Sequence, residues 1–279
     1  MYQKHLSIAL AGNPNSGKTT IFNNMTGTRQ KVGNWPGVTV EKKEGHIKKS
    51  GYDLKIIDLP GTYSLTPFSI EEIVARDFVL EERPDVVIDI IDASNLERSL
   101  YLATQLREID CKVLFALNME DVARNRGIKI DEKKLSELLD VPVVFTVGNK
   151  NKGIDTLLEK AIELAESDDV IPIKRKVKYS KDIEDSISKL EHFIEGLAEG
   201  SIPYNIRWTA IKLIEDDKIV KERIQLKTGK NGRKILKEAT AQRDFLVDRF
   251  DDEPEIVMTD ERYGFIAGII RDVLTTSIK

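Results

Sequence analysis

The stretch LSIALAGNPNSGKTT, residues 6–20, joins an apolar run to a glycine-rich turn and then to a polar segment. The apolar run predicts a buried strand over 6–12, and the residues from Gly17 to Gly27 predict a helix. Between them, GNPNSGKT at 12–19 matches the pattern G-x-x-x-x-G-K-[ST]. The backbone N–H groups of such a turn, together with the start of the following helix, bind phosphate oxygens. The stretch therefore predicts a nucleoside triphosphate site without saying which base it takes.

The residue types in this turn suit the separate tasks of holding a triphosphate. Gly12 and Gly17 let the backbone curve around phosphate oxygens, and Lys18 neutralises the β- and γ-phosphates. The Thr19 hydroxyl is a ligand for Mg²⁺. A chance glycine turn is the alternative, and the strand and helix on either side argue against it. The nucleotide-binding residues expected here are Gly12, Asn13, Pro14, Asn15, Ser16, Gly17, Lys18, Thr19 and Thr20.

Strand and helix patterns alternate through residues 1–168. This alternation predicts an α/β fold with a mainly parallel sheet and helices on both faces, in which ligands bind at the carboxyl ends of the strands. Gly51 lies between two strand patterns and predicts an antiparallel hairpin at one edge, while Ser69 and Glu72 predict a capping box. The expected strands are 6–12, 44–50, 52–58, 86–92, 112–118 and 141–147, and the expected helices are 17–27, 70–80, 95–108, 131–139 and 154–165.

The pattern changes after residue 168, where no convincing strand follows. A polar linker at 169–180 and a small all-α domain at 181–279 are expected. A helical face ends at Gly200, and Thr259 is expected to cap the last helix. These faces carry Ile183, Ile187, Leu190, Ile194 and Leu197, then Trp208, Ile211 and Ile214, then Ile235, Ala239, Gln242 and Leu246, and finally Tyr263, Ile266, Ile270 and Leu274.

Composition limits the class of protein. The net charge of -4 argues against a nucleic-acid binder, and the single Cys111 allows no internal disulfide, as in a reducing cytoplasm. No signal peptide is expected, because the amino end leads directly into a strand. Acidic residues interrupt the apolar runs well short of the roughly 20 residues that a membrane helix needs. The GFIAG stretch at 264–268 predicts close helix packing rather than membrane pairing, since Arg262 and Arg271 flank it.

Two further motifs lie at strand ends. DLPG, at 58–61, can hold Mg²⁺ through a water on Asp58 and can direct the Gly61 N–H to a γ-phosphate. An ordinary strand exit is its alternative, and its place at a carboxyl end favours the functional interpretation. NMED, at 118–121, matches the polar ends of the guanine-reading pattern N-[KT]-x-D.

NMED indicates which base is bound. The Asp121 carboxylate accepts the guanine N1–H and 2-amino group together, which adenine cannot offer, and a wrong base leaves the acid unpaired. Asn118 is expected to brace the loops, and Met119 replaces the usual lysine, changing a stacking contact only. A helix cap is the alternative reading. The TVGNKNKG stretch stands where other GTPases have S-A-K, and there we expect backbone contacts from Val147 and Gly148.

The stretch VGNWPGVTVE, residues 32–41, completes the set. With GNPNSGKTT, DLPGTYSL and NMED in this order, the chain resembles the cytoplasmic GTPase region of the bacterial and archaeal ferrous iron transport protein B family (FeoB) over nearly its whole length. The resemblance implies a Ras-like P-loop GTPase domain followed by a helical domain. It makes 29–41 switch I, where Thr39, beside Gly37 and Val38, closes over Mg²⁺ and the γ-phosphate, and 58–70 switch II.

The resemblance also implies the catalytic set Lys18, Thr39 and Gly61, with Mg²⁺ held by Thr19, Thr39 and, through water, Asp58. Thr62 follows the D-x-x-G glycine where fast GTPases have glutamine, so slow GTP hydrolysis is expected. Asn15 is a candidate K⁺ ligand, as in potassium-stimulated relatives. The implied setting is the cytoplasmic face of the cell membrane. The implied partners are GTP or GDP, a membrane iron-permease domain, small Feo accessory proteins and a second copy of the chain, with no nucleic acid.

Two other functions stay open at this point. The same loops occur in ribosome- or RNA-associated GTPases, but those carry basic modules, whereas from residue 169 onward lysine and arginine equal aspartate and glutamate at 21 each. A nucleotide-binding structural clamp without turnover is the other. The family resemblance implies that the helical domain slows GDP release. No iron site is expected there, because His192 has no cysteine and no second histidine nearby to share a metal.

Overall fold

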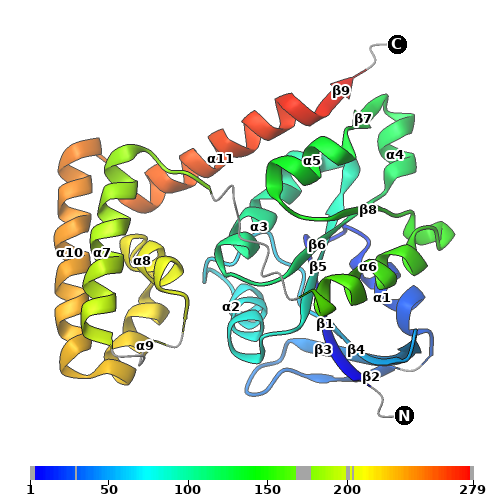
Figure 1. Cartoon of the computed structure of the whole chain (residues 1–279), viewed down its shortest axis with the longest axis horizontal. Coiled ribbons are helices and arrows are strands. Elements are labelled where there is room, and N and C mark those ends of the chain that lie inside the picture. Colours follow the sequence, from blue (N-terminus) through cyan, green and yellow to red (C-terminus); the bar gives the residue numbers. More distant parts are fainter. Residues whose placement is uncertain (1–3, 29, 168–176, 199–201, 203, 277–279) are drawn as a thin grey trace. The chain divides into compact units, whose positions relative to one another are not determined.

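The apolar run at 6–12 forms most of β1 (Lys4–Gly12), the middle strand of a seven-stranded sheet (Figure 1). The computed structural model describes residues 4–28, 30–167, 177–198, 202 and 204–276. Two compact units divide the chain: residues 1–176 with 266–279, and residues 177–265. The expected helical domain, 181–279, differs from the second unit at its carboxyl end, since 266–279 group with the first unit.

The sheet has the order β2-β3-β4-β1-β5-β6-β8. The pairs from β4 through β1, β5 and β6 to β8 are parallel, which confirms the mainly parallel sheet, and β3 and β4 form the expected antiparallel hairpin. The sequence did not predict β2, which pairs with β3 and forms the outer edge. The strands are β2 (Gln30–Asn34), β3 (Glu41–Lys49), β4 (Tyr52–Asp58), β5 (Val86–Asp92), β6 (Val113–Asn118) and β8 (Val143–Phe145).

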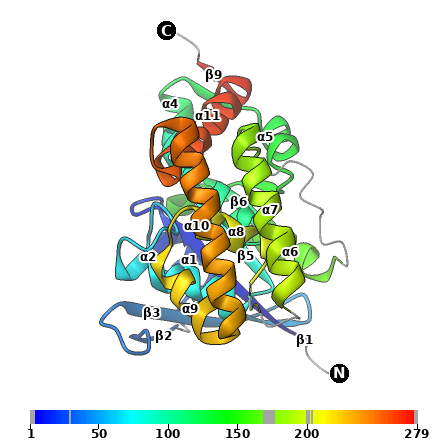
Figure 2. The ribbon, with the colours of Figure 1, turned by 90° about the vertical axis from the view of Figure 1, so that its left-hand side faces the viewer.

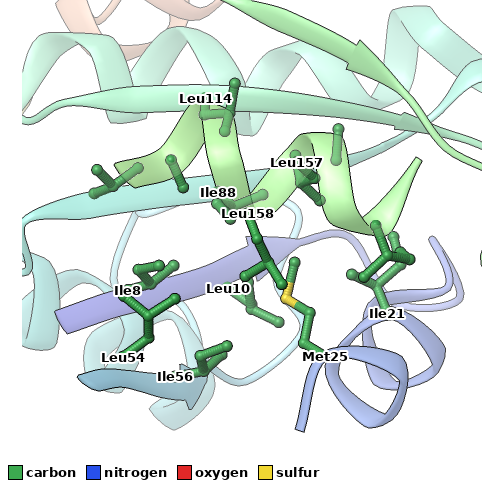
Figure 3. Packing of buried hydrophobic residues seen from close by; sticks show 14 of the residues in the cluster. Ile8, Leu10, Ile21, Met25, Leu54, Ile56, Ile88, Leu114, Leu157 and Leu158 are labelled. Carbon is green, nitrogen blue, oxygen red and sulfur yellow. The ribbon is translucent and has the colours of Figure 1, made fainter. Parts of the chain in front are cut away.

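Helices cover both faces of this sheet. α1 (Lys18–Thr26) and α6 (Ile154–Glu166) bury apolar side chains against the strands. Figure 3 shows Leu157 and Leu158 of α6 in the same buried cluster as Ile88 and Leu114. α2 (Ile70–Asp77) and α3 (Leu96–Glu108) lie on the other face (Figure 1), and α5 (Glu132–Leu139) precedes β8. The capping box of Ser69 and Glu72 is confirmed, and a π-helical turn at 78–82 extends α2.

The structure contains short elements beside NMED that the sequence patterns do not predict. α4 (Glu120–Asn125) follows Met119 directly, and β7 (Ile128–Ile130) pairs antiparallel with β9 (Leu274–Thr276). The Asp131 N–H also donates to the Val273 carbonyl at 2.9 Å. The expectation of no strand after residue 168 was therefore wrong: the last described residues pair with the segment that follows NMED.

The second unit is helical, as expected. α7 (Lys181–Ala198) and α10 (Lys230–Phe250) lie side by side (Figure 2), and Ile183, Ile187, Leu190 and Ile194 are fully buried. The unit also contains α8 (Ile206–Ile214) and α9 (Lys218–Thr228), the latter unpredicted. His192 is exposed, and its Nδ1 lies 2.7 Å from the Ser188 carbonyl. The predicted stop at Gly200 lies outside the described residues.

α11 (Pro254–Val273) departs from its prediction at both its start and its face. It begins at Pro254, a residue suited to the first helical position, so Thr259 lies inside the helix and does not cap it. Tyr263 was expected on the apolar face but is exposed, whereas Arg262 is buried. Within the described part of the chain, none of the helices combines the length and the apolar character that crossing a membrane requires.

Candidate functional site

The phosphate turn leads from β1 into α1 with a backbone that requires glycine. Gly17 has φ 87°, and a Cβ there would lie 2.2 Å from the Asn118 Nδ2. A Cβ on Gly12 would lie 2.7 Å from the Ile90 carbonyl. A side chain at Gly12 would clash with the backbone of β5, and one at Gly17 would clash with the Asn118 side chain. The two pattern glycines are therefore fixed by how closely β5 and β6 approach the turn.

The DLPG turn is bonded to the phosphate turn. Leu10 and Asp58 are paired in the β1–β4 register, and Lys18 donates a hydrogen bond to the Asp58 carboxylate, with both side chains buried. The Thr62 N–H donates to the Gly12 carbonyl at 3.2 Å. A Cβ on Gly61 would lie 3.4 Å from Pro14. The predicted lysine and metal ligand are thus hydrogen-bonded to each other, and the predicted γ-phosphate donor, Gly61, lies close to Pro14 of the phosphate turn.

Asn118 bridges three loops from the end of β6. Its Nδ2 donates to the Ser16 carbonyl at 2.8 Å, and its Oδ1 accepts the Gly148 N–H at 3.0 Å and the Thr146 hydroxyl at 3.3 Å. The side chain is buried, so its amide replaces water as the partner of these groups. The expected bracing role of Asn118 corresponds to these three bonds.

Asp121 lies at the start of α4, beyond Met119, whose φ is 61°. Its Oδ1 accepts the Val122 N–H at 3.0 Å, and its Oδ2 accepts a hydrogen bond from the Lys150 Nζ at 2.6 Å. The Lys150 hydrogen bond is the largest influence on this carboxyl and holds its pKa below the usual value. No local sequence pattern relates Lys150 to Asp121, so this pair is not predictable from the sequence.

Hydrogen bonds hold the backbone of the loop after β8 in place. The Val147 N–H donates to the Lys152 carbonyl at 3.2 Å, and the Gly148 N–H is taken by Asn118. Both are buried, and Asn24 donates to the Gly148 carbonyl at 2.7 Å. In this conformation both predicted N–H groups already have protein partners, and their contacts to a base stay a prediction.

Residues 30–41 of the segment predicted as switch I form β2, the hairpin loop and the first residue of β3. The Trp35 N–H donates to the Val40 carbonyl at 2.9 Å and closes the loop that holds Gly37, Val38 and Thr39. Thr39 is exposed, and the described contacts do not join it to the phosphate turn. Trp35 is 7% exposed and packs edge-to-face on Phe78, with ring centroids 5.3 Å apart. The tryptophan therefore packs inward rather than standing in solvent.

The remaining turn residues divide into buried and exposed groups. Asn13 and Ser16 are buried, and the Asn13 Nδ2 donates to the Arg98 carbonyl at 3.2 Å. Asn15, which has φ 66°, and both Thr19 and Thr20 are exposed. Oxygen ligands on these accessible side chains, together with the Asp58 carboxylate, suit hard cations such as Mg²⁺.

One contact in this region was not predicted from the sequence. The Arg98 guanidinium stacks 4.0 Å from the centre of the Tyr63 ring, just after DLPG. Such a cation–π contact holds the second predicted switch against the start of α3. Because Tyr63 and Arg98 are far apart in sequence, only the fold brings them together.

Family comparisons match both units. A profile described as "Ferrous iron transport protein B" matches residues 6–161, and one described as "FeoB cytosolic helical domain" matches residues 179–275. The chain belongs to the FeoB family. An Fe(2+) transport protein A/Fe(2+) transporter FeoB fusion protein of Porphyromonas gingivalis is 39% identical over 283 residues, which are 98% of this chain and 33% of that protein. The Fe(2+) transporter FeoB of Salmonella typhimurium is 36% identical over 282 residues, which are 99% of this chain and 34% of that protein. The chain thus spans about a third of the length of these curated FeoB relatives.

Solved FeoB structures share the fold. A GDP-bound point mutant of the S. thermophilus FeoB G-domain has TM-score 0.85 at 41% identity, covering 97% of this chain and 100% of that one. The T. maritima FeoB cytosolic domain in its apo form has TM-score 0.82 at 34% identity and covers 97% of this chain and 100% of that one. Its GMPPNP form has TM-score 0.81 at 34% identity and covers 97% of this chain and 99% of that one. The first unit therefore has the fold of a FeoB G domain, and a FeoB helical domain follows it.

Proposed function

We propose that this chain binds GTP and GDP, hydrolyses GTP slowly, and serves as the nucleotide-sensing part of a ferrous iron transporter. The observation that carries the proposal is the Asn118 bridge, which joins the phosphate turn, NMED and the 146–148 loop by three hydrogen bonds. Together with the Lys18–Asp58 pair, it gathers the phosphate and base residues at the carboxyl edge of the sheet. Relatives crystallised with GDP and GMPPNP support the same ligand class.

The chain's own groups supply the binding chemistry. The backbone of residues 12–17 and the start of α1 surround the phosphates, and Lys18 moves from Asp58 to the β- and γ-phosphates. Asp121 reads the guanine edge, with Met119 and the backbone of Val147 and Gly148 against the base. Thr19, Thr39 and water-linked Asp58 would hold Mg²⁺, whose charge offsets that of the phosphates. Because Thr39 is exposed on the hairpin, the 35–40 loop has to move for this role.

Slow hydrolysis follows from the residue after Gly61. Thr62 is 4% exposed, and its N–H is bonded to Gly12, so its side chain is not free to orient an attacking water. The backbone groups of the two switches must do this instead, which is a weaker arrangement than a positioned glutamine. The exposed Asn15 amide is a suitable K⁺ ligand, and a bound K⁺ would add positive charge beside the phosphates.

The regulatory setting is inferred from the relatives. They are about three times as long and are named Fe(2+) transporters, so we infer a membrane iron-permease domain as the main partner, on the cytoplasmic face of the membrane. Small Feo accessory proteins and a second copy of the chain are further candidate partners. The helical domain is proposed to slow GDP release. Comparing the GDP release rates of the full chain and of a chain that ends at residue 168 would measure this effect.

A binding and turnover assay tests the proposal. The wild-type chain should bind GDP in preference to ADP and release phosphate from GTP, whereas Lys18→Ala should lose both activities. Thr228→Ala, on the last turn of α9 in the second unit, is the matched control and should behave as wild type. Equal affinity for ADP would reject the guanine assignment. Nucleotide binding without turnover would instead favour the structural clamp.

A further inference from the structure

Lys150 occupies the carboxylate that is proposed to read guanine. The Lys150 Nζ lies 2.6 Å from the Asp121 Oδ2, while the other carboxylate oxygen accepts the Val122 N–H. The lysine side chain is 53% exposed and that of Asp121 is 27% exposed, so both can be reached by a ligand. A guanine base needs both carboxylate oxygens for its two donors. The lysine and one of the guanine donors would therefore bind the same Oδ2 atom.

The fold fixes the lysine in front of this acid. Lys150 ends a short 3-10 helix, Gly148–Lys150, whose first N–H is held by Asn118. Val147 and Lys152 form an isolated bridge with two 3.2 Å hydrogen bonds. A Cβ on Gly153 would lie 2.2 Å from the Phe145 carbonyl, so this turn packs closely against the end of β8. The backbone that carries Lys150 is thus held beside the base residues.

The chain lacks lysine at the two places where a guanine-reading loop usually carries it. Met119 stands at the lysine position of N-K-x-D, and Gly148 stands at the lysine position of S-A-K. Lys150 instead donates directly to the carboxylate.

We propose that Lys150 is a competing counterion that speeds nucleotide release by reclaiming the Asp121 carboxylate from guanine. This inference rests on the proposed guanine reading by Asp121. An exposed ion pair of this kind changes an equilibrium by about 1.5- to 5-fold. The chain with lysine at 150 should therefore release GDP faster than one without it, by a factor within this range.

The test measures release of a fluorescent GDP from the full chain by stopped flow, at low and high sodium chloride. Lys150→Met keeps the apolar stem but removes the charge. Lys152→Met, in the same loop, is the matched control, and Lys150→Arg keeps the charge. We expect Lys150→Met to release GDP about 1.5- to 5-fold more slowly than the other chains at low salt. At high salt the difference should shrink, because an exposed pair is screened.

A double-mutant cycle and the selectivity of the wild type separate the two proposals. In an Asp121→Asn background, assayed with the xanthosine diphosphate that this variant is expected to bind, Lys150→Met should have no further effect, because the carboxylate for which lysine and base compete is absent. If the wild type prefers GDP over ADP but Lys150→Met releases GDP as fast as Lys152→Met, or faster, the competing role is overturned while guanine binding stands. If the wild type shows no preference for GDP, both proposals are overturned.

Discussion

Replacing Asn118 by alanine should destabilise the first unit before any nucleotide is added. The change removes three hydrogen bonds and leaves the Ser16 carbonyl and the Gly148 N–H without their partner at a buried site. A buried unsatisfied backbone group costs about 1–3 kcal/mol, so the expected loss is roughly 2–5 kcal/mol. For a unit of this size, that lowers the melting temperature by about 5–15 °C.

The two tryptophans allow this loss to be assigned to one unit. Trp35 is buried in the first unit and Trp208 in the second, so a Trp208→Phe background leaves a fluorescence signal from the first unit alone. Urea and thermal unfolding would be compared for Asn118→Ala, Asn118→Asp and the control Asn125→Ala, whose side chain is exposed on α4. Asn118→Asp keeps the acceptor for Gly148 and should fall between the other two. An Asn118→Ala midpoint equal to that of Asn125→Ala would refute the bridging role.

Three other predictions concern the base, the cation and a buried acid. Asp121→Asn should turn the preference from GDP to xanthosine diphosphate, because an amide donor suits a carbonyl at C2; competition binding measures this, and an unchanged GDP preference counts against it. Asn15→Ala should hydrolyse GTP at the same rate in sodium and potassium, while the wild type is faster in potassium; equal wild-type rates would remove the K⁺ site. Burial raises the pKa of Asp89 to about 8, and its Oδ2 has no hydrogen-bond partner among the described residues. The folded state thus keeps a proton that the unfolded state releases near pH 4. As the pH rises from about 4 to about 8, the unfolding free energy should therefore fall by up to about 1.4 kcal/mol per pH unit. Asp89→Asn should lack this slope in urea midpoints from pH 5 to 8, and identical slopes would contradict the burial argument.

The sequence predicted those parts of the site that depend on strand ends. GNPNSGKT, DLPG and NMED each follow an apolar strand, and parallel strands bring their carboxyl ends to one edge, so their proximity could be expected. The capping box at Ser69 was also local, because both partners lie within one helical turn. The helical faces of α7 and α8 were legible because apolar residues recur every three to four positions.

The missed features are short or depend on distant residues. β7 and β9 have three residues each, too few for an alternation pattern, and their partners are far apart in sequence. The Lys150–Asp121 pair joins two loops without any local signal. The residues around Trp35 show no apolar periodicity, so the sequence could not predict whether its side chain is buried or exposed. Pro254, which suits the first position of a helix, marks the start of α11 in the sequence better than Thr259 does.

The pairing of β7 with β9 gives the chain an order of assembly on the ribosome. β7 is synthesised early, but its partner strand emerges only after α7 to α11 have been made. During translation the segment after NMED therefore exposes an unpaired strand edge while the helical unit is being synthesised and folded. Pairing β9 with β7 closes a loop that includes the whole helical unit. The entropic cost of this closure grows only slowly with loop length. The helical unit is thus inserted within the first unit, which cannot complete its β7–β9 sheet until the helical unit has been synthesised. A nascent chain halted before residue 274 would lack β9.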